Sequence, residues 1–202
     1  MTTEDNGAAR RGVTPSQTVG PFFHYCLTPN AYGYAEVVTD DLLTEDAAGE
    51  RIRIEGRVFD GDGQPITDAM IEIWQADGEG RYASPADTRV RPNTRFKGFG
   101  RSACNSEGGY RFTTVKPGSV PGPDGRAQAP HVNVGIFARG LLKRLFTRIY
   151  FADEAANAGD PILALVPEDA RATLIARRRD GEPTYTFDIH LQGKNETVFF
   201  EA

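Results

Sequence analysis

The 202-residue sequence contains only two cysteines and one tryptophan. Cys26 and Cys104 lie far apart without CxxC spacing, which excludes a disulfide framework and a cysteine-based zinc site. We expect both thiols to be buried and reduced. The sequence also lacks a Gly-x-Ser-x-Gly motif, and no serine or cysteine has a histidine placed to identify it as a nucleophile. Hydrolase chemistry therefore has no positive support.

Positive charge and long apolar runs are also scarce. With 23 Lys and Arg against 28 Asp and Glu, the formal net charge is −5, which gives no basic surface for nucleic acid or anionic lipid. No apolar run approaches the roughly 20 residues that cross a bilayer. The first 12 residues lack the apolar stretch of a signal peptide. These absences predict a cytoplasmic protein with no nucleic-acid or membrane partner.

Composition divides the chain into three segments around one domain. Residues 1–13 are polar and rich in small side chains, which predicts a disordered tail. Residues 14–50 are expected to form an N-terminal arm and interface segment, because prolines and aromatic residues gather there without helical or alternating periodicity. We expect residues 14–25 of this arm to be extended. Residues 51–202 carry the pattern of a single folded domain, and the chain is too short to need a second.

Apolar residues alternate with polar ones in most of residues 51–202, which is the period of half-buried strands. Gly- and Pro-rich breaks separate these runs, and one helix is expected at Pro167–Arg177. This pattern predicts an all-β fold, an antiparallel β-sandwich with an N-terminal arm and one or two short helices. The expected strands are 52–58, 70–74, 110–114, 131–137, 147–151, 185–191 and 197–200.

Two residues on one expected strand are candidate metal ligands. His131 and Asn133 are two positions apart, so their side chains project from the same face. A second histidine would make half of a metal site, but an amide binds transition metals poorly. Tyr82 follows a strand and enters a polar loop, where a phenolate could bind a ferric ion. A packed histidine and a hydrogen-bonded surface tyrosine remain the alternatives.

Basic residues follow the strand that carries His131. Arg139 comes at its end, before Gly140, and could hold a carboxylate through two hydrogen bonds. The alternative is a solvated charge at a strand end. Lys143, Arg144 and Arg148 are expected to belong to a solvated face, since charges scattered near a turn usually do.

Eight segments form a recognisable set in their order along the chain: Thr14–Phe22, Gly56–Ile66, Ala69–Asp77, Gly80–Tyr82, Gly109–Phe112, Lys116–Gly118, Ala129–His131 and Thr147–Phe151. Together they resemble the intradiol ring-cleaving dioxygenases. The resemblance runs from Thr14 to the C-terminus. It implies a β-sandwich and a ferric ion held by two tyrosines and two histidines. It also implies insertion of both atoms of dioxygen into the ring of an aromatic diol.

The sequence departs from the ligand pattern of this family at two of four positions. Tyr82 matches the first tyrosine and His131 the first histidine, whereas Val120 and Asn133 stand where the second tyrosine and second histidine belong. We call these four residues the vestigial ligand positions. The pattern resembles the α subunits of such enzymes. It implies no catalytic residue in this chain alone, with Fe(III) held by a homologous β subunit in a hetero-oligomer of αβ units.

The resemblance also implies a substrate-side role for residues outside the ligand set. Thr18, Gly20, Pro21 and Phe22 in the arm, together with Arg139, match features that face the active site of the β subunit in this family. Two alternatives stay open. The chain could be a stand-alone catechol dioxygenase with unusual ligands, or a β-sandwich that binds a partner without enzymatic activity.

Overall fold

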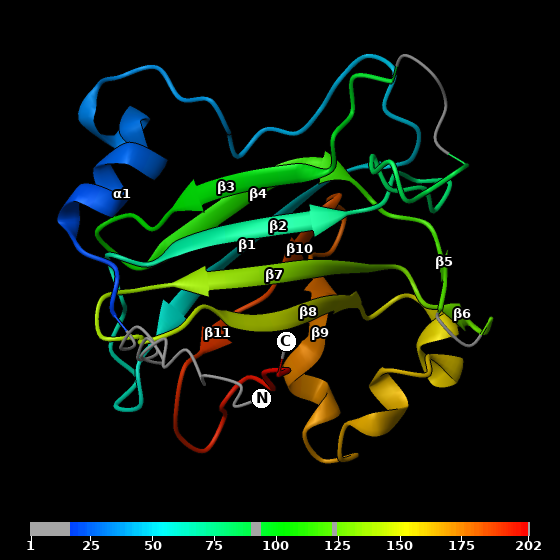
Figure 1. Ribbon diagram of the computed structural model, residues 1–202. Coiled ribbons are helices and arrows are strands. Elements are labelled where there is room, and N and C mark those ends of the chain that lie inside the picture. Colours follow the sequence, from blue (N-terminus) through cyan, green and yellow to red (C-terminus); the bar gives the residue numbers. More distant parts are fainter. Residues whose placement is uncertain (1–16, 90–93, 123–124, 202) are drawn as a thin grey trace, which may run out of the picture.

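The computed structural model describes residues 17–89, 94–122 and 125–201, so the tail at 1–13 and residues 14–16 lie outside it. A nine-stranded sheet runs in the order β11-β1-β10-β9-β8-β7-β2-β3, with β4 also paired to β1 (Figure 1). Its strands are β1 (Arg51–Phe59), β2 (Met70–Gln75), β3 (Phe99–Ala103), β4 (Gly109–Val115), β7 (His131–Phe137), β8 (Leu145–Phe151), β9 (Ile175–Arg178), β10 (Thr184–Thr186) and β11 (Ile189–His190). A separate hairpin pairs β5 (Val120–Pro121) with β6 (Ala127–Gln128).

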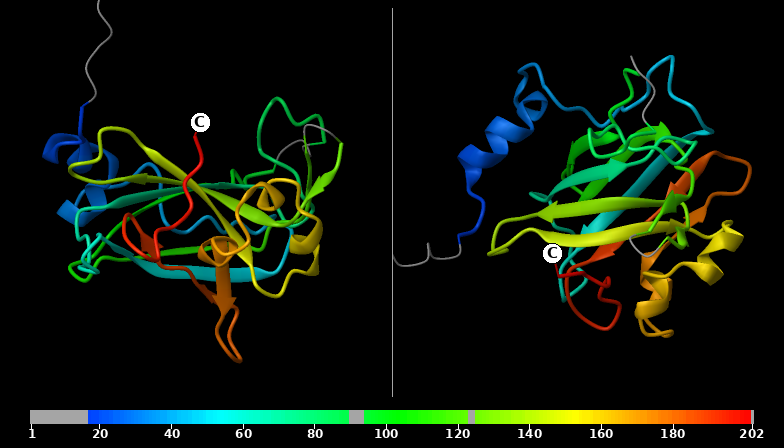
Figure 2. Two further views of the ribbon diagram at one scale, coloured as in Figure 1. Left: turned by 90° about the horizontal axis from the view of Figure 1, so that it is seen from below. Right: turned by 45° about the vertical axis from the view of Figure 1, so that its right-hand side comes forward.

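The sheet folds into two facing layers, which confirms the all-β sandwich. One layer contains β4, β1 and β10, the other contains β3, β2, β7 and β8, and β9 pairs with both β8 and β10 (Figures 1 and 2). Alternating residues such as Ile54 and Phe112 in one layer, and Ile73 and Val134 in the other, are buried between them. Most pairings are antiparallel, but β1–β10, β1–β11 and β8–β9 are parallel.

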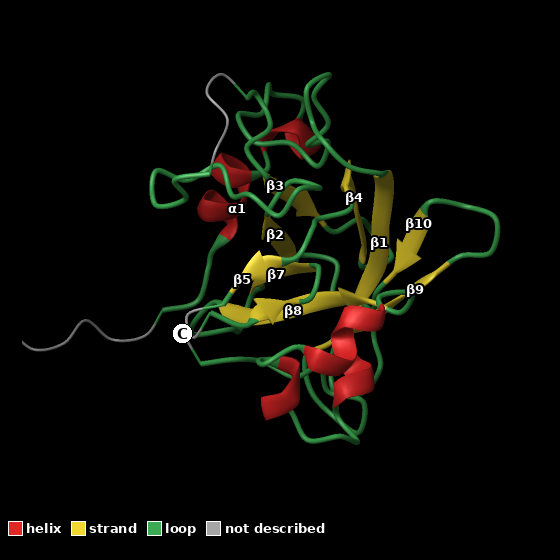
Figure 3. Cartoon of the chain, turned by 90° about the vertical axis from the view of Figure 1, so that its right-hand side faces the viewer, coloured by secondary structure: helices red, strands yellow, loops and turns green. Residues whose placement is uncertain are grey.

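The expected helix at Pro167–Arg177 is wrong. That segment forms a short 3₁₀ helix, η4 (Arg171–Leu174), and then enters β9. The pairing of β9 with β8 and β10 outweighs the helix propensity of this segment, as tertiary contacts often do. With η2 (Ala155–Gly159) and η3 (Leu163–Leu165), η4 lies beside the sandwich near β8 (Figure 3).

The expected extended arm is also wrong from residue 21 onward. Helix α1 (Pro21–Leu27) stands beside the sandwich, followed by η1 (Pro29–Tyr32) (Figure 2). Proline is well suited to a first helical position because its missing N–H would be unpaired there anyway. At the other end, Arg101 Nη1 donates to the carbonyl oxygen of Leu27 at 3.1 Å.

Two C-terminal strands differ from expectation. The expected strand 185–191 is divided into β10 and β11, with Phe187 between them in the sequence. Both short strands pair with β1. Residues 197–200 form only an isolated bridge between Phe200 and Phe146.

Cys26 is exposed, which corrects the expectation that both thiols are buried, and Cys104 is half-buried. None of the described helices is long and apolar enough to cross a membrane, and the cytoplasmic location stays a prediction.

A close approach at Gly56 explains the division between β10 and β11. A Cβ atom at Gly56 would lie 1.8 Å from the Phe187 carbonyl oxygen, which also accepts a hydrogen bond from Tyr110 Oη at 2.7 Å. Any side chain at this position would push the last strands away from β1. The position therefore requires glycine for space.

Gly56→Ala is expected to lower the free energy of unfolding by about 1–3 kcal/mol, because the backbone must move to admit the methyl group. Chemical denaturation measures the change. Gly159→Ala is the control, since nothing lies within 4 Å of its Cβ position, and it should change stability by less than about 0.5 kcal/mol. Equal stability of the two variants would contradict this account.

Candidate functional site

The pairing of β7 with its two neighbours gathers the candidate residues on one face of the sheet. Asn133 lies opposite Arg148 of β8 and Trp74 of β2, and His131 lies opposite Tyr150 of β8. Directly opposed residues of an antiparallel pair project from the same face, with Cβ atoms roughly 4.5–5.5 Å apart. All five side chains therefore share the outer face of this layer, away from the core between the layers.

Tyr82 covers this face from the loop after β2. Asn133 Nδ2 donates to Tyr82 Oη and to the carbonyl oxygen of Trp74, both at 3.1 Å. The rings of Trp74 and Tyr82 lie 4.8 Å apart. Burial raises the pKa of Tyr82, although the hydrogen bond from Asn133 opposes the shift. Tyr82 is therefore a neutral phenol at pH 7, engaged with the residue that occupies the second histidine position.

Val120 borders the same region from the β5–β6 hairpin. It is buried and pairs with Gln128, whose Oε1 accepts a hydrogen bond from Arg148 Nη1 at 2.7 Å. Arg148 Nη1 also lies 3.4 Å from Tyr150 Oη. The expectation that Arg148 belongs to a solvated face is therefore wrong: its guanidinium is held among the residues around the vestigial ligand positions.

His131 is the one vestigial position with a donor atom in the right state for a metal. Its Nδ1 lies 2.7 Å from the carbonyl oxygen of Ala129, so Nδ1 carries the proton and Nε2 keeps its lone pair. Burial, assisted by the charge of Arg148, lowers the pKa of His131 to about 4. The imidazole is neutral at pH 7.

A buried carboxylate supports the strand that carries His131. Asp160 Oδ2 accepts from Ala129 N at 2.7 Å, and Oδ1 accepts from Tyr150 Oη at 3.1 Å and from Leu163 N at 2.7 Å. Burial raises the pKa of Tyr150 to about 12, so its hydroxyl stays protonated and donates. These bonds fix the segment before β7 and the tyrosine opposite His131.

These residues do not fit a ferric ion. A hard trivalent cation requires anionic oxygen donors, whereas the four positions offer one neutral phenol, one imidazole, one aliphatic side chain and one amide nitrogen turned toward the phenol. Within residues 17–89, 94–122 and 125–201, no three His, Cys, Asp or Glu side chains gather as a metal site. The arrangement is a closed hydrogen-bonded cluster.

Two of the residues expected on the substrate side, Thr18 and Arg139, lie near the other end of β7. Thr18 Oγ1 accepts a hydrogen bond from Gly140 N at 2.7 Å, which brings the arm beside Arg139. The Arg139 side chain is 82% exposed and its Nε lies 3.2 Å from Asp68 Oδ2. Gly20 is exposed, whereas the side chains of Pro21 and Phe22 lie outside the description. His131 begins β7 and Arg139 follows its end; because the strand between them spans roughly 20 Å, the two groups are separate.

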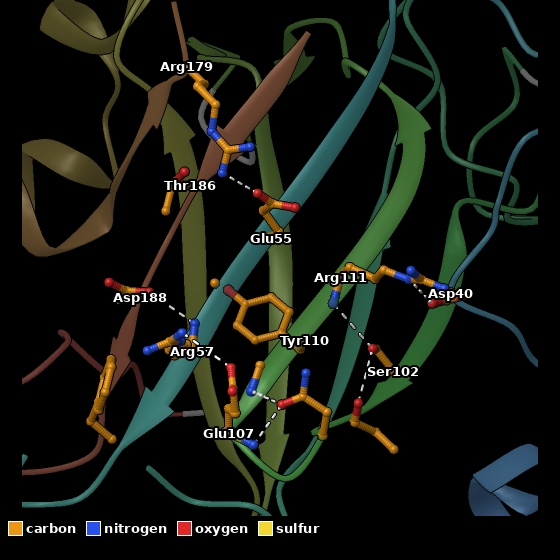
Figure 4. Close-up of a pocket in the computed structure, with 15 residues that line it drawn as sticks. Asp40, Glu55, Arg57, Ser102, Glu107, Tyr110, Arg111, Arg179, Thr186 and Asp188 are labelled. Atoms are coloured by element: carbon orange, nitrogen blue, oxygen red, sulfur yellow. Dashed lines mark hydrogen bonds and ion pairs between the residues drawn. The ribbon is translucent and has the colours of Figure 1, made fainter. Parts of the chain in front are cut away.

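A large depression of about 760 Å³ lies elsewhere, across β1, β3 and β4 (Figure 4). Its charges pair with one another. Arg57 Nη2 lies 3.4 Å from Glu107 Oε2, Arg111 Nε lies 3.2 Å from Asp40 Oδ2, and Arg179 pairs with Glu55. These ion pairs lie on the surface of the sandwich and contribute no residue to the candidate site.

Comparison with known proteins decides the family. The profile of the family described as Dioxygenase matches residues 19–193. The chain belongs to this dioxygenase family. The protocatechuate 3,4-dioxygenase alpha chain of Burkholderia cepacia is 46% identical over 197 residues, covering 94% of this chain and 97% of that one. The beta chain of the same organism is 37% identical, covering 92% and 78%.

The fold is shared with solved dioxygenases. The dioxygenase domain of a dioxygenase carbohydrate-binding protein fusion from Streptomyces sp. SirexAA-E superposes with a TM-score of 0.58 at 25% identity, covering 89% of this chain and 98% of that one. The resemblance to intradiol dioxygenases inferred from the eight segments is confirmed.

Protonation of His131 should make stability depend on pH. Its folded pKa of about 4 lies below its ordinary value of 6.5, so the unfolded chain takes up the proton first. The contribution of His131 to the free energy of unfolding is complete above pH 6.5. As the pH falls toward 4, up to about 3 kcal/mol of it is lost. His131→Gln should flatten this part of the pH–stability curve in urea denaturation. An unchanged slope in the His131→Gln variant would refute the assignment.

Proposed function

We propose that this dioxygenase-family chain is the metal-free, alpha-type subunit of a protocatechuate 3,4-dioxygenase. The assembled enzyme would use dioxygen to open the ring of 3,4-dihydroxybenzoate to 3-carboxy-cis,cis-muconate, with both oxygen atoms retained in the product. The observation that carries the proposal is the similarity to an alpha chain over 97% of that chain's length, together with a ligand set that lacks two of four donors. Fe(III) would be held by a homologous beta-type partner, which supplies the oxidative chemistry.

The chain's own contribution would be to bind and orient the substrate. Arg139 is exposed at the end of β7, and its ion pair with Asp68 engages the Nε side of the guanidinium. The remaining N–H groups can hold a carboxylate in a bidentate geometry. Thr18 ties the arm to the adjacent turn through Gly140 N, so the backbone at 18–22 would form a wall beside this cation.

The arm and the segment after it offer a surface for the partner. Phe23 contacts the ring of Phe137, with centroids 6.1 Å apart, and remains 44% exposed. Exposed apolar residues that gather in one region are typical of protein interfaces. The others in this region are Tyr25, Tyr32, Tyr34 and Val37. We infer that residues 14–50 bury this surface against the beta-type chain.

The chain purified alone should contain far less than one iron per chain and no visible absorption from tyrosinate-to-iron charge transfer. Val120 supplies no donor, and the Asn133 amide is bonded to Tyr82. Metal analysis and visible spectroscopy measure this, with the co-purified complex as the positive control. Tightly bound ferric ion at about one per isolated chain would favour the stand-alone enzyme. Failure to associate with any homologous dioxygenase chain would favour a binding module.

Arg139→Ala in the assembled complex should lower kcat/KM for 3,4-dihydroxybenzoate by about ten- to a hundredfold, chiefly through KM. The reason is the loss of a charge-assisted hydrogen bond of about 1.5–3 kcal/mol. Activity toward catechol, which has no carboxylate, and iron content should not change. Arg144→Ala is the matched control, an exposed arginine after the same turn. If both substrates are affected equally, or neither is, Arg139 does not bind the carboxylate.

A further inference from the structure

We propose that Arg101, oriented by Glu72, is a positioning residue that holds the N-terminal arm in place on the sandwich. The arm carries the proposed substrate-side wall at residues 18–22, so its position would set the shape of the partner's pocket on that side. The inference rests on the proposed function and adds to it a residue that would touch neither the substrate nor the metal.

Arg101 and Glu72 form an ion pair within the sheet. They lie directly opposite each other in the β3–β2 pairing, on the outer face of that layer. Arg101 Nε and Nη2 both donate to Glu72 Oε1, at 2.9 and 2.6 Å. The side chain of Arg101 is only 14% exposed and that of Glu72 only 12%. Charged side chains are almost never this buried unless they are paired, and the pair holds the guanidinium in one orientation.

The remaining end of the guanidinium reaches the arm. Arg101 Nη1 donates to the carbonyl oxygen of Leu27, the last residue of α1, at 3.1 Å. The last carbonyl groups of a helix have no partner within the helix, and a bond from a charged donor is stronger than one from a neutral donor. The rigid fork of arginine lets one side chain bond to Glu72 and to Leu27 at the same time.

Two further contacts join the arm to the sandwich, and neither involves a charged group. Thr18 Oγ1 accepts from Gly140 N, and the exposed ring of Phe23 lies 6.1 Å from that of Phe137. The bond from Arg101 is therefore the charge-assisted contact among these three. Without it, α1 is free to pivot about the other two, and the wall at residues 18–22 loses its fixed position.

The competing explanation is that the ion pair only stabilises the sheet. A buried pair is weak evidence for this, because the cost of desolvating two charges offsets their attraction. Substitutions separate the two roles. Arg101→Met removes the bond to Leu27, and Glu72→Gln keeps the shape of the carboxylate but releases the guanidinium. Arg144→Met is the matched control: Arg144 Nη1 lies 3.7 Å from Glu72 Oε2, longer than a hydrogen bond, and none of the described contacts of Arg144 involves the arm.

In the co-purified complex, Arg101→Met and Glu72→Gln should each raise KM about tenfold, with iron content unchanged. The increase should be equal for 3,4-dihydroxybenzoate and catechol, because the wall faces the ring that both share. In the chain purified alone, hydrogen exchange followed by mass spectrometry should show the amides of residues 18–27 exchanging about tenfold faster than in the wild type. Arg144→Met should match the wild type in both measurements.

Wild-type KM values in the two folded variants would overturn the inference. So would a higher KM without faster exchange in the arm, and so would an increase confined to 3,4-dihydroxybenzoate, which would assign the effect to Arg139. Loss of folding or assembly in both variants would make the pair structural and would also overturn it. A wild-type complex that opens neither ring would instead contradict the proposed function, and the exchange rates would still report whether Arg101 holds the arm. The two failures are therefore distinguishable.

Discussion

The antiparallel pairing of β7 with β2 and β8 is the constraint on which the site depends. Because side chains alternate across a strand, this register sends Val132 and Val134 into the core and leaves His131 and Asn133 on the outer face. A shift of one residue would exchange the two sets. Arg139 follows the end of the same strand by two residues, so one element positions His131, Asn133 and the proposed substrate-side cation.

The outer face has become a hydrogen-bonded cluster in place of a coordination site. Asn133 donates to Tyr82, Arg148 donates to Gln128, and Tyr150 donates to Asp160. Buried polar groups must find partners, and here other protein atoms supply them. We infer that this cluster, and not a change in the sandwich, distinguishes the chain from the iron-holding partner proposed above.

Much of the fold could be predicted from the sequence, because strands such as 131–137 alternate clearly. The helix expected at 167–177 failed since pairing of β9 with two strands overrides local propensity, and α1 was missed because the arm shows no helical period. The four ligand positions followed from the family motifs. Arg148 was missed because its charge suggested solvent, and because the register that places it opposite Asn133 is known only from the structure.

The proposed role of this chain is to complete the active-site pocket of a partner that holds the iron. The central claim is best tested by crystallography of the co-purified complex with bound 3,4-dihydroxybenzoate, using anomalous scattering at the iron edge. The account predicts one iron peak per pair of chains, in the partner, with the Arg139 guanidinium within about 3 Å of the substrate carboxylate. An iron peak between Tyr82 and His131, or Arg139 turned to solvent far from every ligand, would contradict it.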